Sequence, residues 1–541
     1  MKKLLKQLLA VTTAIMMAIT LLPAMANAEE NVPEKGTLQI IKHGKDEGTL
    51  LGGAEFTFYK LASITYSTNS SDGVNWKYAV VDHYASVLGG STGEKNLNDL
   101  PSKTWEEKAT IDSLSVLAET DTGTRSGLTA SENNAEDNTK KGYTNPKPLD
   151  FGVYLVKETT TPSGHVAGEP FIVSIPSTNN YNFGKEGGTK EEGKDAGTGF
   201  VYHIVAAPKN SEVTVEKTAN DKSVAIGQTV NYTVNTTIPK YGTEYFYTDK
   251  NGKEVVPKFE VYDTLSEGLT LKEGSITVKV GDTTITPKDQ EEKDNYTIKY
   301  NTDSKTFLLS FSSNYLKNMT TSQAITITYS ATVNENAVYK NGNTAGVKYS
   351  NKPGESTLGD PVESKEDVYT YGIDLKKTGD KENDKNGLSG AEFTLSSSTR
   401  NLFKVLINGK TVVVTDKNGN PVAVDTIEKK ITNDKGKLVF KGLAEGTYTL
   451  TETKAPAGYT LLKNPITIVI GANEDGTIKS ATVNGKETET TDGVVPVDIK
   501  NHSGFTLPGT GGMGTYIFTI GGLVVMAGAV LLLVSSKKKR A

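Results

Sequence analysis

The chain has 541 residues, a formal net charge of −5, 53 glycines and no cysteine. This length exceeds what one hydrophobic core supports, so two to four domains are expected. The acidic balance argues against a nucleic-acid-binding protein, which typically carries a basic patch, and the lack of cysteine excludes disulfide cross-links. Long helical periodicities are missing, so we expect all-β domains.

The N-terminus has the pattern of a secretory signal peptide at 1–28. A charged start with three lysines precedes an apolar stretch from Leu8 to Leu22, and small residues at Ala26 to Ala28 form a cleavage site. The alternative interpretation is a membrane anchor. We expect a secreted protein, whose exported domains are stabilised without disulfides.

Two segments of the chain occur twice. LGGAEFT at Leu51–Thr57 matches LSGAEFT at Leu388–Thr394, and YLVKETTTPSGH at Tyr154–His165 matches YTLTETKAPAGY at Tyr448–Tyr459. In both copies a strand that bears a lysine precedes these segments. The repeats therefore predict two related domains.

The related domains are expected at 29–210 and 371–503. The region between them, 211–370, lacks both repeats but contains alternating strand patterns such as QTVNYTVNTT and AITITYSATV. We expect this region to be a third β-sandwich of a different subtype.

Each domain opens with a strand that ends in a lysine on its apolar face, because residues at i and i+2 share a face. This alternation places three lysines on the same face as the apolar residues of their strands. They are Lys42 in TLQIIK, Lys217 in EVTVEK, and Lys377 rather than Lys376 in GIDLKK. Burying an ammonium group costs several kcal/mol unless it is paired or deprotonated. An inward lysine can instead protect an edge strand from aggregation, but its recurrence in three domains favours a function.

Each domain also directs a carboxyl and a carboxamide group to its apolar face. The acids in this phase are Glu158 in YLVKE, Asp263 in KFEVYDTL and Glu452 in YTLTE. The asparagines are Asn210 in YHIVAAPKN, Asn501 in VPVDIKN, and either Asn343 or Asn351 in the middle region. Alternation along the strand does not decide between Asn343 and Asn351, because both fall on the same face. Asn351, however, lies in SNKPG, a turn signal.

A lysine, a carboxyl group and an asparagine on inward faces can form a cross-link. Desolvation lowers the pKa of the lysine and raises that of the carboxyl group, which gives a neutral amine beside a protonated acid. The amine attacks the carboxamide carbon, the acid moves protons, and ammonia leaves. The product is a Lys–Asn isopeptide bond, formed once per domain.

The C-terminal region, 504–541, combines three features. A pentapeptide is followed by an uncharged, mostly apolar stretch at 515–534, long enough to span a bilayer as a helix, and by a basic tail that stays cytoplasmic. The pentapeptide is Leu507-Pro508-Gly509-Thr510-Gly511. This arrangement resembles the cell-wall sorting signal of Gram-positive surface proteins, in which a sortase cleaves after the threonine. The apolar stretch is then a temporary anchor.

The mature chain resembles the sortase-assembled major (backbone) pilins of Gram-positive bacteria, of the three-domain SpaA type. YTLTETKAPAGY resembles the E-box of this family, and VYDTLSEGLT resembles the segment that carries the catalytic Asp of its fimbrial D2 (CnaA-like) domain. The resemblance implies an all-β chain of three tandem Ig-like sandwiches, CnaB-like, CnaA/D2-like and CnaB-like. They lie between the signal peptide and the sorting signal.

The resemblance also implies three bonds and the acids that assist them. The bonds are Lys42–Asn210 assisted by Glu158, Lys217–Asn343 assisted by Asp263, and Lys377–Asn501 assisted by Glu452. Asn343 is preferred to Asn351 because the family places this asparagine where the final strand begins.

In such pilins a class C sortase joins the sorting-signal threonine, here Thr510, to a lysine of the next subunit. The motif around that lysine usually ends Tyr-Pro-Lys-Asn, and here it reads Ala207-Pro208-Lys209-Asn210. Strand phase turns Asn210 inward and Lys209 outward, so Lys209 is the expected inter-subunit lysine. The implied partners are identical subunits, a class C and a housekeeping sortase, minor pilins, peptidoglycan and a host surface ligand. The implied location is a pilus anchored in the cell wall.

The sequence is also compatible with other functions. The same modules could form an unpolymerised wall-anchored adhesin or a minor tip or basal pilin. An enzyme is not expected, because no nucleophile motif or phosphate loop accompanies His43 or His165. DKNGN at Asp416–Asn420 resembles the start of a calcium loop, but Ile427 stands where that loop needs Glu. We expect a hairpin turn there, no metal site and no cofactor.

Overall fold

The computed structural model describes residues 32–46, 48–69, 73–89, 93–133, 140–177, 201–248, 251–287, 295–302, 305–353, 358–413 and 422–504, and positions 522, 525, 526 and 529. The signal peptide, the DKNGN segment, the sorting pentapeptide and the basic tail lie outside the described residues. Only four positions of the expected membrane helix are described. Within the described ranges, no helix is long and apolar enough to cross a membrane.

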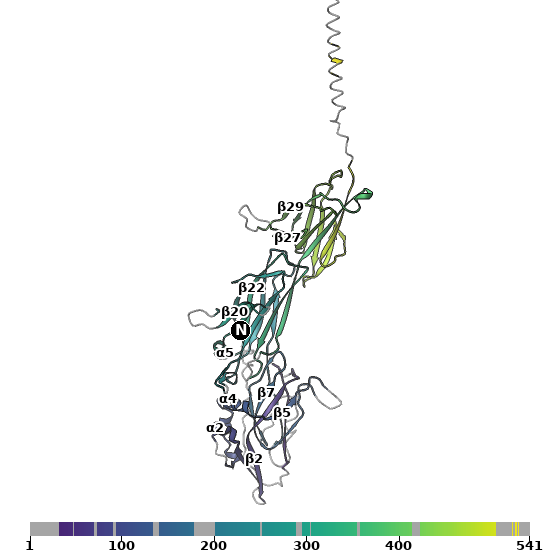
Figure 1. The fold of residues 1–541 in the computed structure, drawn as a ribbon. Coiled ribbons are helices and arrows are strands. Elements are labelled where there is room, and N and C mark those ends of the chain that lie inside the picture. Colours follow the sequence, from purple (N-terminus) through teal and green to yellow (C-terminus); the bar gives the residue numbers. More distant parts are fainter. Residues whose placement is uncertain are drawn as a thin grey trace, which may run out of the picture.

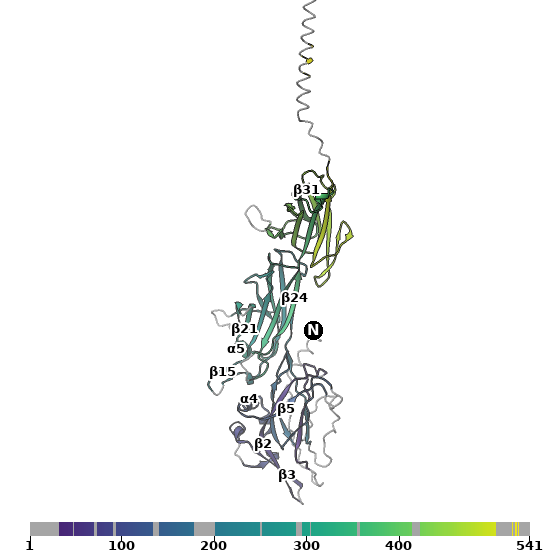
Figure 2. The same cartoon turned by 45° about the vertical axis from the view of Figure 1, so that its right-hand side comes forward.

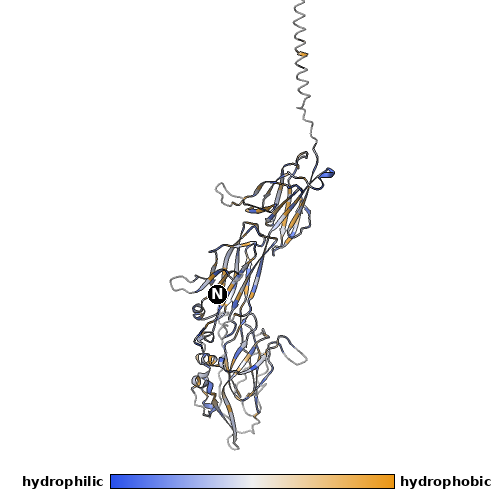
Figure 3. Cartoon of the chain, viewed as in Figure 1, coloured by the Kyte–Doolittle hydropathy of each residue, from blue (hydrophilic) through white to orange (hydrophobic). Residues whose placement is uncertain are grey.

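Three β bodies follow one another along a rod, from the purple N-terminal body to the green and yellow C-terminal body (Figures 1 and 2). Each has its own hydrophobic core. The first core draws on residues from Leu38 to Ala206, the second on residues from Val166 to Val368, and the third on residues from Tyr369 to Ile499. Hydrophobic and hydrophilic positions are interspersed along the strands of all three bodies (Figure 3).

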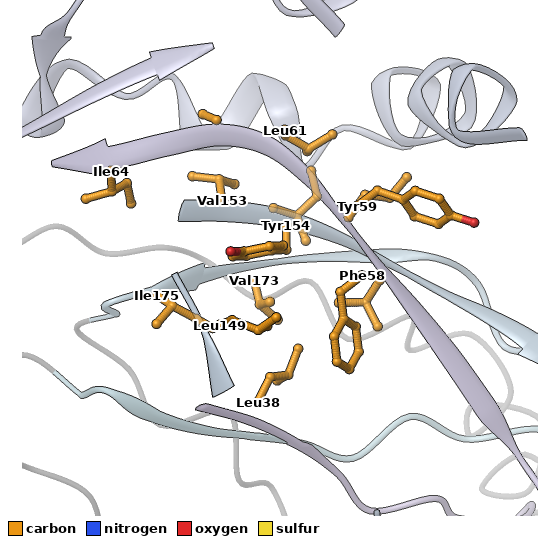
Figure 4. Close-up of a cluster of buried hydrophobic side chains, with 14 of the residues drawn as sticks. Leu38, Phe58, Tyr59, Leu61, Ile64, Leu149, Val153, Tyr154, Val173 and Ile175 are labelled. Atoms are coloured by element: carbon orange, nitrogen blue, oxygen red, sulfur yellow. The ribbon is translucent and has the colours of Figure 1, made fainter. Parts of the chain in front are cut away.

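The first body contains a small and a larger sheet. The small sheet has the order β10 (His203–Ala206), β1 (Gly36–Ile40), β6 (Lys147–Leu149). The larger sheet has the order β4 (Lys95–Asn96), β3 (Gly73–Val80), β2 (Glu55–Asn69), β7 (Gly152–Thr160), β9 (Phe171–Ile175), with β5 (Thr124–Leu128) also paired to β2. Leu38 of β1 and Leu149 of β6 lie beside Phe58 of β2 and Val173 of β9 in the core (Figure 4). Burial of these side chains between the sheets stabilises the body.

Three short helices lie between β3 and β5, and the sequence did not indicate them. They are α2 (Ala85–Leu88), α3 (Ser102–Trp105) and α4 (Lys108–Leu117). They bury Trp105 and Leu114 in the first core. Their helical periodicity is weak because none is longer than 10 residues.

The middle body has two large sheets. One has the order β12 (Val215–Ala219), β13 (Thr229–Ile238), β22 (Gln323–Val333), β18 (Thr277–Val280), β19 (Thr283–Ile285), with β17 (Leu269–Leu271) paired to β22. The other has the order β20 (Tyr296–Thr302), β21 (Lys305–Phe311), β16 (Phe259–Leu265), β23 (Lys340–Tyr349), β24 (Val362–Tyr369). A hairpin of β14 (Tyr247–Thr248) and β15 (Glu254–Val255) and the helix α5 (Ser313–Lys317) complete the body.

The third body has five-stranded and six-stranded sheets. The first has the order β28 (Lys410–Val413), β27 (Lys404–Ile407), β30 (Lys437–Leu443), β25 (Tyr371–Gly379), β35 (Val494–Asn501). The second has the order β29 (Thr426–Ile431), β26 (Glu392–Ser397), β31 (Gly446–Lys454), β32 (Ile466–Ala472), β33 (Ile478–Val483), β34 (Lys486–Glu487).

The opening strand of each outer body pairs in parallel with a late strand: β1 with β10, and β25 with β35. The middle body differs, because β12 pairs antiparallel with β13. Asn343 lies in β23, and β24 follows it along the chain. The expectation that Asn343 begins the final strand was therefore wrong: after β23 the chain turns back and adds one more strand at the edge of the sheet.

Backbone contacts connect the bodies. A short pair of β8 (His165–Val166) and β11 (Ser211–Glu212) links the first body to the second, and Val166 enters the second core. At the other end the backbone N–H of Ile226 donates to Gly442 of the third body. These contacts place the segment around Lys209 at the junction of the first two bodies.

Candidate functional site

All three lysines that strand phase turns inward are buried. The exposed fractions are 0% for Lys42, 3% for Lys217 and 0% for Lys377. Each lies beside one buried carboxyl group, and burial of a charged amine is unfavourable without such a partner. The molecule therefore contains three separate polar clusters inside apolar cores.

In the third body, Lys377 Nζ donates a hydrogen bond to Asn501 Oδ1 and lies 3.3 Å from Glu452 Oε1. Asn501 Nδ2 donates to both oxygens of Glu452, at 3.0 and 3.2 Å. The backbone N–H of Leu462 also donates to Glu452 Oε2, at 2.9 Å. Burial lowers the pKa of Lys377 to about 8, although the nearby Glu452 carboxylate opposes this shift. A substantial fraction of the amine is therefore neutral near pH 8.

The strand register explains this contact. In the parallel pair of β25 and β35, Lys377 is opposite Ile499, and Asn501 is two residues further along, opposite Gly379. Both side chains point to the same face of the sheet, and Glu452 reaches them from β31 in the facing sheet. A long lysine side chain spans this two-residue offset, which a shorter cation would not.

The first body repeats the arrangement. Lys42 Nζ lies 3.1 Å from Glu158 Oε2, and Asn210 Nδ2 donates to Glu158 Oε1 at 2.8 Å. Burial lowers the pKa of Lys42, against the opposing effect of Glu158. The backbone N–H of Gly168 donates to Glu158 Oε2 at 3.1 Å. Lys42 Nζ also donates to the carbonyl of Pro208 at 3.3 Å.

The two outer clusters share details that the sequence did not reveal. A parallel bridge pairs His43 with Lys209, so Asn210 again lies two residues beyond the position opposite the lysine. In both clusters the backbone N–H ten residues after the glutamate donates to that glutamate. The two donors, Gly168 and Leu462, each lie three residues beyond the repeated segment, so the repeat did not indicate this hydrogen bond.

The middle cluster contains a residue that the sequence analysis missed. Lys217 Nζ donates to Asp263 Oδ2 at 2.6 Å and to the hydroxyl of Tyr329. The Tyr329 hydroxyl donates to Asp263 Oδ2 at 2.5 Å and accepts from Asn343 Nδ2 at 2.8 Å. Tyr329 lies in phase with buried Ile325 and Ile327 of β22, and a buried tyrosine hydroxyl usually has a partner. The inward position of Tyr329 in this alternation was the one signal in the sequence that could have pointed to it.

Burial shifts the pKa values of the middle cluster in opposite directions. It lowers the pKa of Lys217 and raises that of Asp263, while their mutual attraction opposes both shifts. Lys217 and Tyr329 belong to one sheet, and Asp263 and Asn343 belong to the facing sheet. The cluster therefore lies between the sheets, whereas each outer lysine and its asparagine come from neighbouring strands.

Asn351 lies elsewhere. It is half-buried at the junction with the first body, where its backbone carbonyl accepts a hydrogen bond from the N–H of Ala167 at 2.8 Å. The carbonyl also accepts from the hydroxyl of Tyr245 at 3.3 Å. The structure brings Asn343, and not Asn351, into the cluster of Lys217, where both residues bond the Tyr329 hydroxyl.

Lys209 and Asn210 point in opposite directions. Lys209 is exposed, and Asn210 and Pro208 are buried. The backbone on both sides is held by His43, whose N–H donates to Pro208 and whose carbonyl accepts from the N–H of Asn210. Ala207, where related motifs have Tyr, is buried with an exposed fraction of 6%.

Two parts of the chain match known families. Residues 372–486 match the SpaA prealbumin-like fold domain, and residues 499–540 match the LPXTG cell wall anchor motif. The fimbrial subunit type 1 of Actinomyces viscosus is 27% identical over 72% of this chain and 74% of its own length. The fimbrial subunit type 2 of Actinomyces naeslundii is 25% identical over 98% of this chain and 96% of its own length.

Solved structures share the fold. The full-length major pilin SpaD from Corynebacterium diphtheriae has a TM-score of 0.50 at 22% identity, covering 88% of this chain and 99% of that structure. The T6 backbone pilin of serotype M6 Streptococcus pyogenes has a TM-score of 0.52 at 19% identity, covering 87% and 99%. The chain therefore carries a SpaA prealbumin-like domain and an LPXTG cell wall anchor motif, and it is similar to fimbrial subunits over most of its length.

Proposed function

We propose that this chain is the backbone subunit of a covalent pilus with two kinds of cross-link. A class C sortase joins Thr510 of one subunit to Lys209 of the next. Inside each subunit, the three buried lysines form isopeptide bonds to Asn210, Asn343 and Asn501. The contact of Lys377 with Asn501 and Glu452 in a buried site carries this proposal.

The proposed domain division follows the three cores. A CnaB-like domain occupies 29–210, a D2/CnaA-like domain occupies 211–370, and a CnaB-like domain with an E-box occupies 371–503. The sorting signal follows at 504–541. A housekeeping sortase, minor pilins and peptidoglycan are the further partners of such a subunit.

The geometry of the third body supports a complete reaction. The neutral amine of Lys377 adds to the carboxamide carbon of Asn501, and the new C–N bond forms. Oxygen Oε1 of Glu452 lies near both nitrogens, so the carboxyl group can take the proton that Nζ loses and return it to Nδ2. The bond from carbon to Nδ2 breaks, and ammonia leaves. Glu452 ends in its starting protonation state, and no second turnover follows.

The positions of the proposed cross-links suit a fibre under tension. Force that enters a subunit at Lys209 passes through the second and third domains and leaves at Thr510. The Lys217–Asn343 and Lys377–Asn501 bonds lie on this path, whereas the Lys42–Asn210 bond lies beside it. The third-domain bond transmits the force directly from Lys377 to Asn501, so the chain between these two residues carries no load. All three bonds also restrict the conformational freedom of the unfolded state, as long-range disulfides do.

Mass spectrometry tests the internal bonds. The intact mass of the secreted chain should be lower by three ammonia molecules than the mass calculated from its sequence without the signal peptide. Proteolysis should yield three branched peptides that contain the pairs named above. An intact mass equal to the sequence mass would reject the internal bonds.

A polymerisation assay tests Lys209. Replacing Lys209→Ala should abolish the high-mass ladder of pilin on blots of cell-wall extracts. Lys45→Ala is the matched control, because Lys45 is also exposed near His43 and should leave the ladder unchanged. A normal ladder from the Lys209→Ala strain would favour an unpolymerised adhesin or another acceptor lysine.

A further inference from the structure

The acid of the middle cluster has a shorter reach than the acids of the outer clusters. Glu158 and Glu452 accept hydrogen bonds directly from the carboxamides of Asn210 and Asn501. Asp263 has one methylene fewer. It accepts from Lys217 and Tyr329, and no hydrogen bond joins it to Asn343 in the described part of the chain. Another group must therefore connect the acid to the asparagine if all three domains react alike.

The hydroxyl of Tyr329 occupies this position. It accepts hydrogen bonds from Lys217 Nζ and from Asn343 Nδ2, and it donates to Asp263 Oδ2. A single oxygen atom thus contacts the amine, the leaving nitrogen and the acid. In the outer clusters, one carboxyl group makes the equivalent contacts.

The ring of Tyr329 is held firmly in the core. Its exposed fraction is 2%, it stacks on Tyr232 with ring centroids 5.5 Å apart, and the edge of Phe307 packs against it at 5.2 Å. Burial raises the pKa of Tyr329 well above its ordinary value, so the hydroxyl keeps its proton in the folded domain. The group is therefore a fixed, neutral hydroxyl that can both donate and accept a proton.

We propose that Tyr329 is a catalytic residue of the middle domain, where it carries a proton from Lys217 to the departing nitrogen of Asn343. This inference rests on the proposed Lys217–Asn343 bond. As Nζ adds to the carboxamide carbon, Nζ gives one proton to the Tyr329 oxygen, and the hydroxyl gives its own proton to Nδ2. The bond from carbon to Nδ2 breaks, ammonia leaves, and the tyrosine hydroxyl is regenerated. Asp263 orients the hydroxyl and the amine through its two hydrogen bonds.

The test uses the chain without its signal peptide and truncated before Leu507, recovered unreacted from inclusion bodies in urea and refolded by dilution. The branched peptide that contains Lys217 and Asn343 is quantified by mass spectrometry over time. Tyr329→Phe keeps the ring and removes the hydroxyl, so this bond should form about 100-fold more slowly, the usual contribution of positioned proton transfer. The bonds of the two outer domains serve as internal controls and should form at the wild-type rate.

Tyr296→Phe is the matched control. Tyr296 is also a buried tyrosine of the middle body, with an exposed fraction of 2%, but its hydroxyl donates to the backbone carbonyl of Ile285 at 3.2 Å and not to the cluster. This variant should therefore react at nearly the wild-type rate. Equal slowing of both variants would assign the effect to packing and overturn the proposal, as would a fast Tyr329→Phe variant.

A rescue variant separates chemistry from folding. In Asp263→Glu combined with Tyr329→Phe, the longer acid can reach Asn343 directly, as in the outer domains. This double variant should react about tenfold faster than Tyr329→Phe alone, and no gain would contradict the argument from reach. If the wild-type chain yielded no Lys217–Asn343 peptide, the proposed bond itself would be rejected. This outcome differs from a rejection of the Tyr329 role alone, in which the bond forms but does not depend on the hydroxyl.

Discussion

Lys377 and Asn501 lie 124 positions apart in the sequence, yet the amine of one donates a hydrogen bond to the amide oxygen of the other. The parallel pairing of β25 with β35 and an offset of two residues produce this contact. The same offset recurs between Lys42 and Asn210 in the first body. The recurrence ties the chemistry of both domains to one feature of strand register.

Removing the third-domain bond should lower the stability of that domain markedly. Lys377→Met removes the amine, while Glu452 keeps its hydrogen bonds from Asn501 Nδ2 and from the backbone N–H of Leu462. Closing a loop of this length stabilises a domain by about 5 kcal/mol in the chain-entropy account. We expect the melting temperature of the third domain to fall by about 15 °C, as measured by calorimetry.

Lys376→Ala is the control for this substitution. Lys376 is the next residue, but its amine donates to the backbone carbonyls of Asn386 and Lys435 at the surface. The variant should keep the full loss of ammonia and melt close to the wild type. Equal melting temperatures for Lys377→Met and wild type would contradict a stabilising bond.

Glu452→Gln should slow the third-domain reaction without changing the fold. The amide cannot accept the proton that Lys377 loses, and positioned proton transfer contributes about 100-fold to 10,000-fold in rate. The branched peptide of Lys377 and Asn501 should appear slowly during refolding, while the first-domain peptide appears at its usual rate. A wild-type rate for the variant would remove Glu452 from the mechanism.

The third-domain reaction should depend on pH through Lys377. Only the neutral amine attacks, and burial lowers the pKa of this lysine to about 8. The rate should therefore rise with pH through the region of this pKa, about 8, and level off at higher pH, where the amine is fully neutral. Refolding of the unreacted chain at pH values on both sides of 8, followed by mass spectrometry, measures this profile. A rate independent of pH across this range would contradict attack by a titrating amine.

The chain between the middle and third bonds should extend under tension, whereas the parts enclosed by each bond should not. With both bonds formed, the stretch from Asn343 to Lys377 is the longest unbridged segment on the path of force. It contains the edge strand β24, which pairs only with β23 within its sheet. Its 34 positions reach at most about 120 Å when extended, so single-molecule stretching should show a step no longer than this.

Lys217→Met is the control for the stretching experiment. Without the bond, the whole middle domain can unravel, and its step should become several times longer. A long step in the bonded wild type would show that the bond does not divide the domain as proposed.

The local pattern of the sequence identified most of the polar clusters. Alternation along single strands placed Lys42, Lys217 and Lys377 on apolar faces, because side-chain direction in a strand depends only on parity. The same rule placed Glu158, Asp263 and Glu452 there. It left Asn343 and Asn351 equivalent, since both have the same parity and differ only in which strand or loop holds them.

The strand order of the middle domain needed the structure. Pairing between strands far apart in the chain depends on loops, sheet edges and the packing of two sheets, none of which a single strand encodes. The added edge strand β24 escaped sequence analysis for this reason, and the helices α2 to α4 escaped it because they are too short to show a clear helical periodicity. Tyr329 escaped it because an inward tyrosine is ordinary in a core unless its hydroxyl partners are known.

The sequence by itself determined which residues face inward, the repeat of the outer domains and the presence of a sorting pentapeptide, because these are properties of short segments. Only the tertiary structure decided that Asn343 joins the middle cluster through Tyr329, that Asn351 lies at a domain junction, and that Tyr329 stands between Asp263 and Asn343. Those relationships join segments that are far apart in the sequence. Their distances depend on how the sheets pack, which is a property of the whole domain.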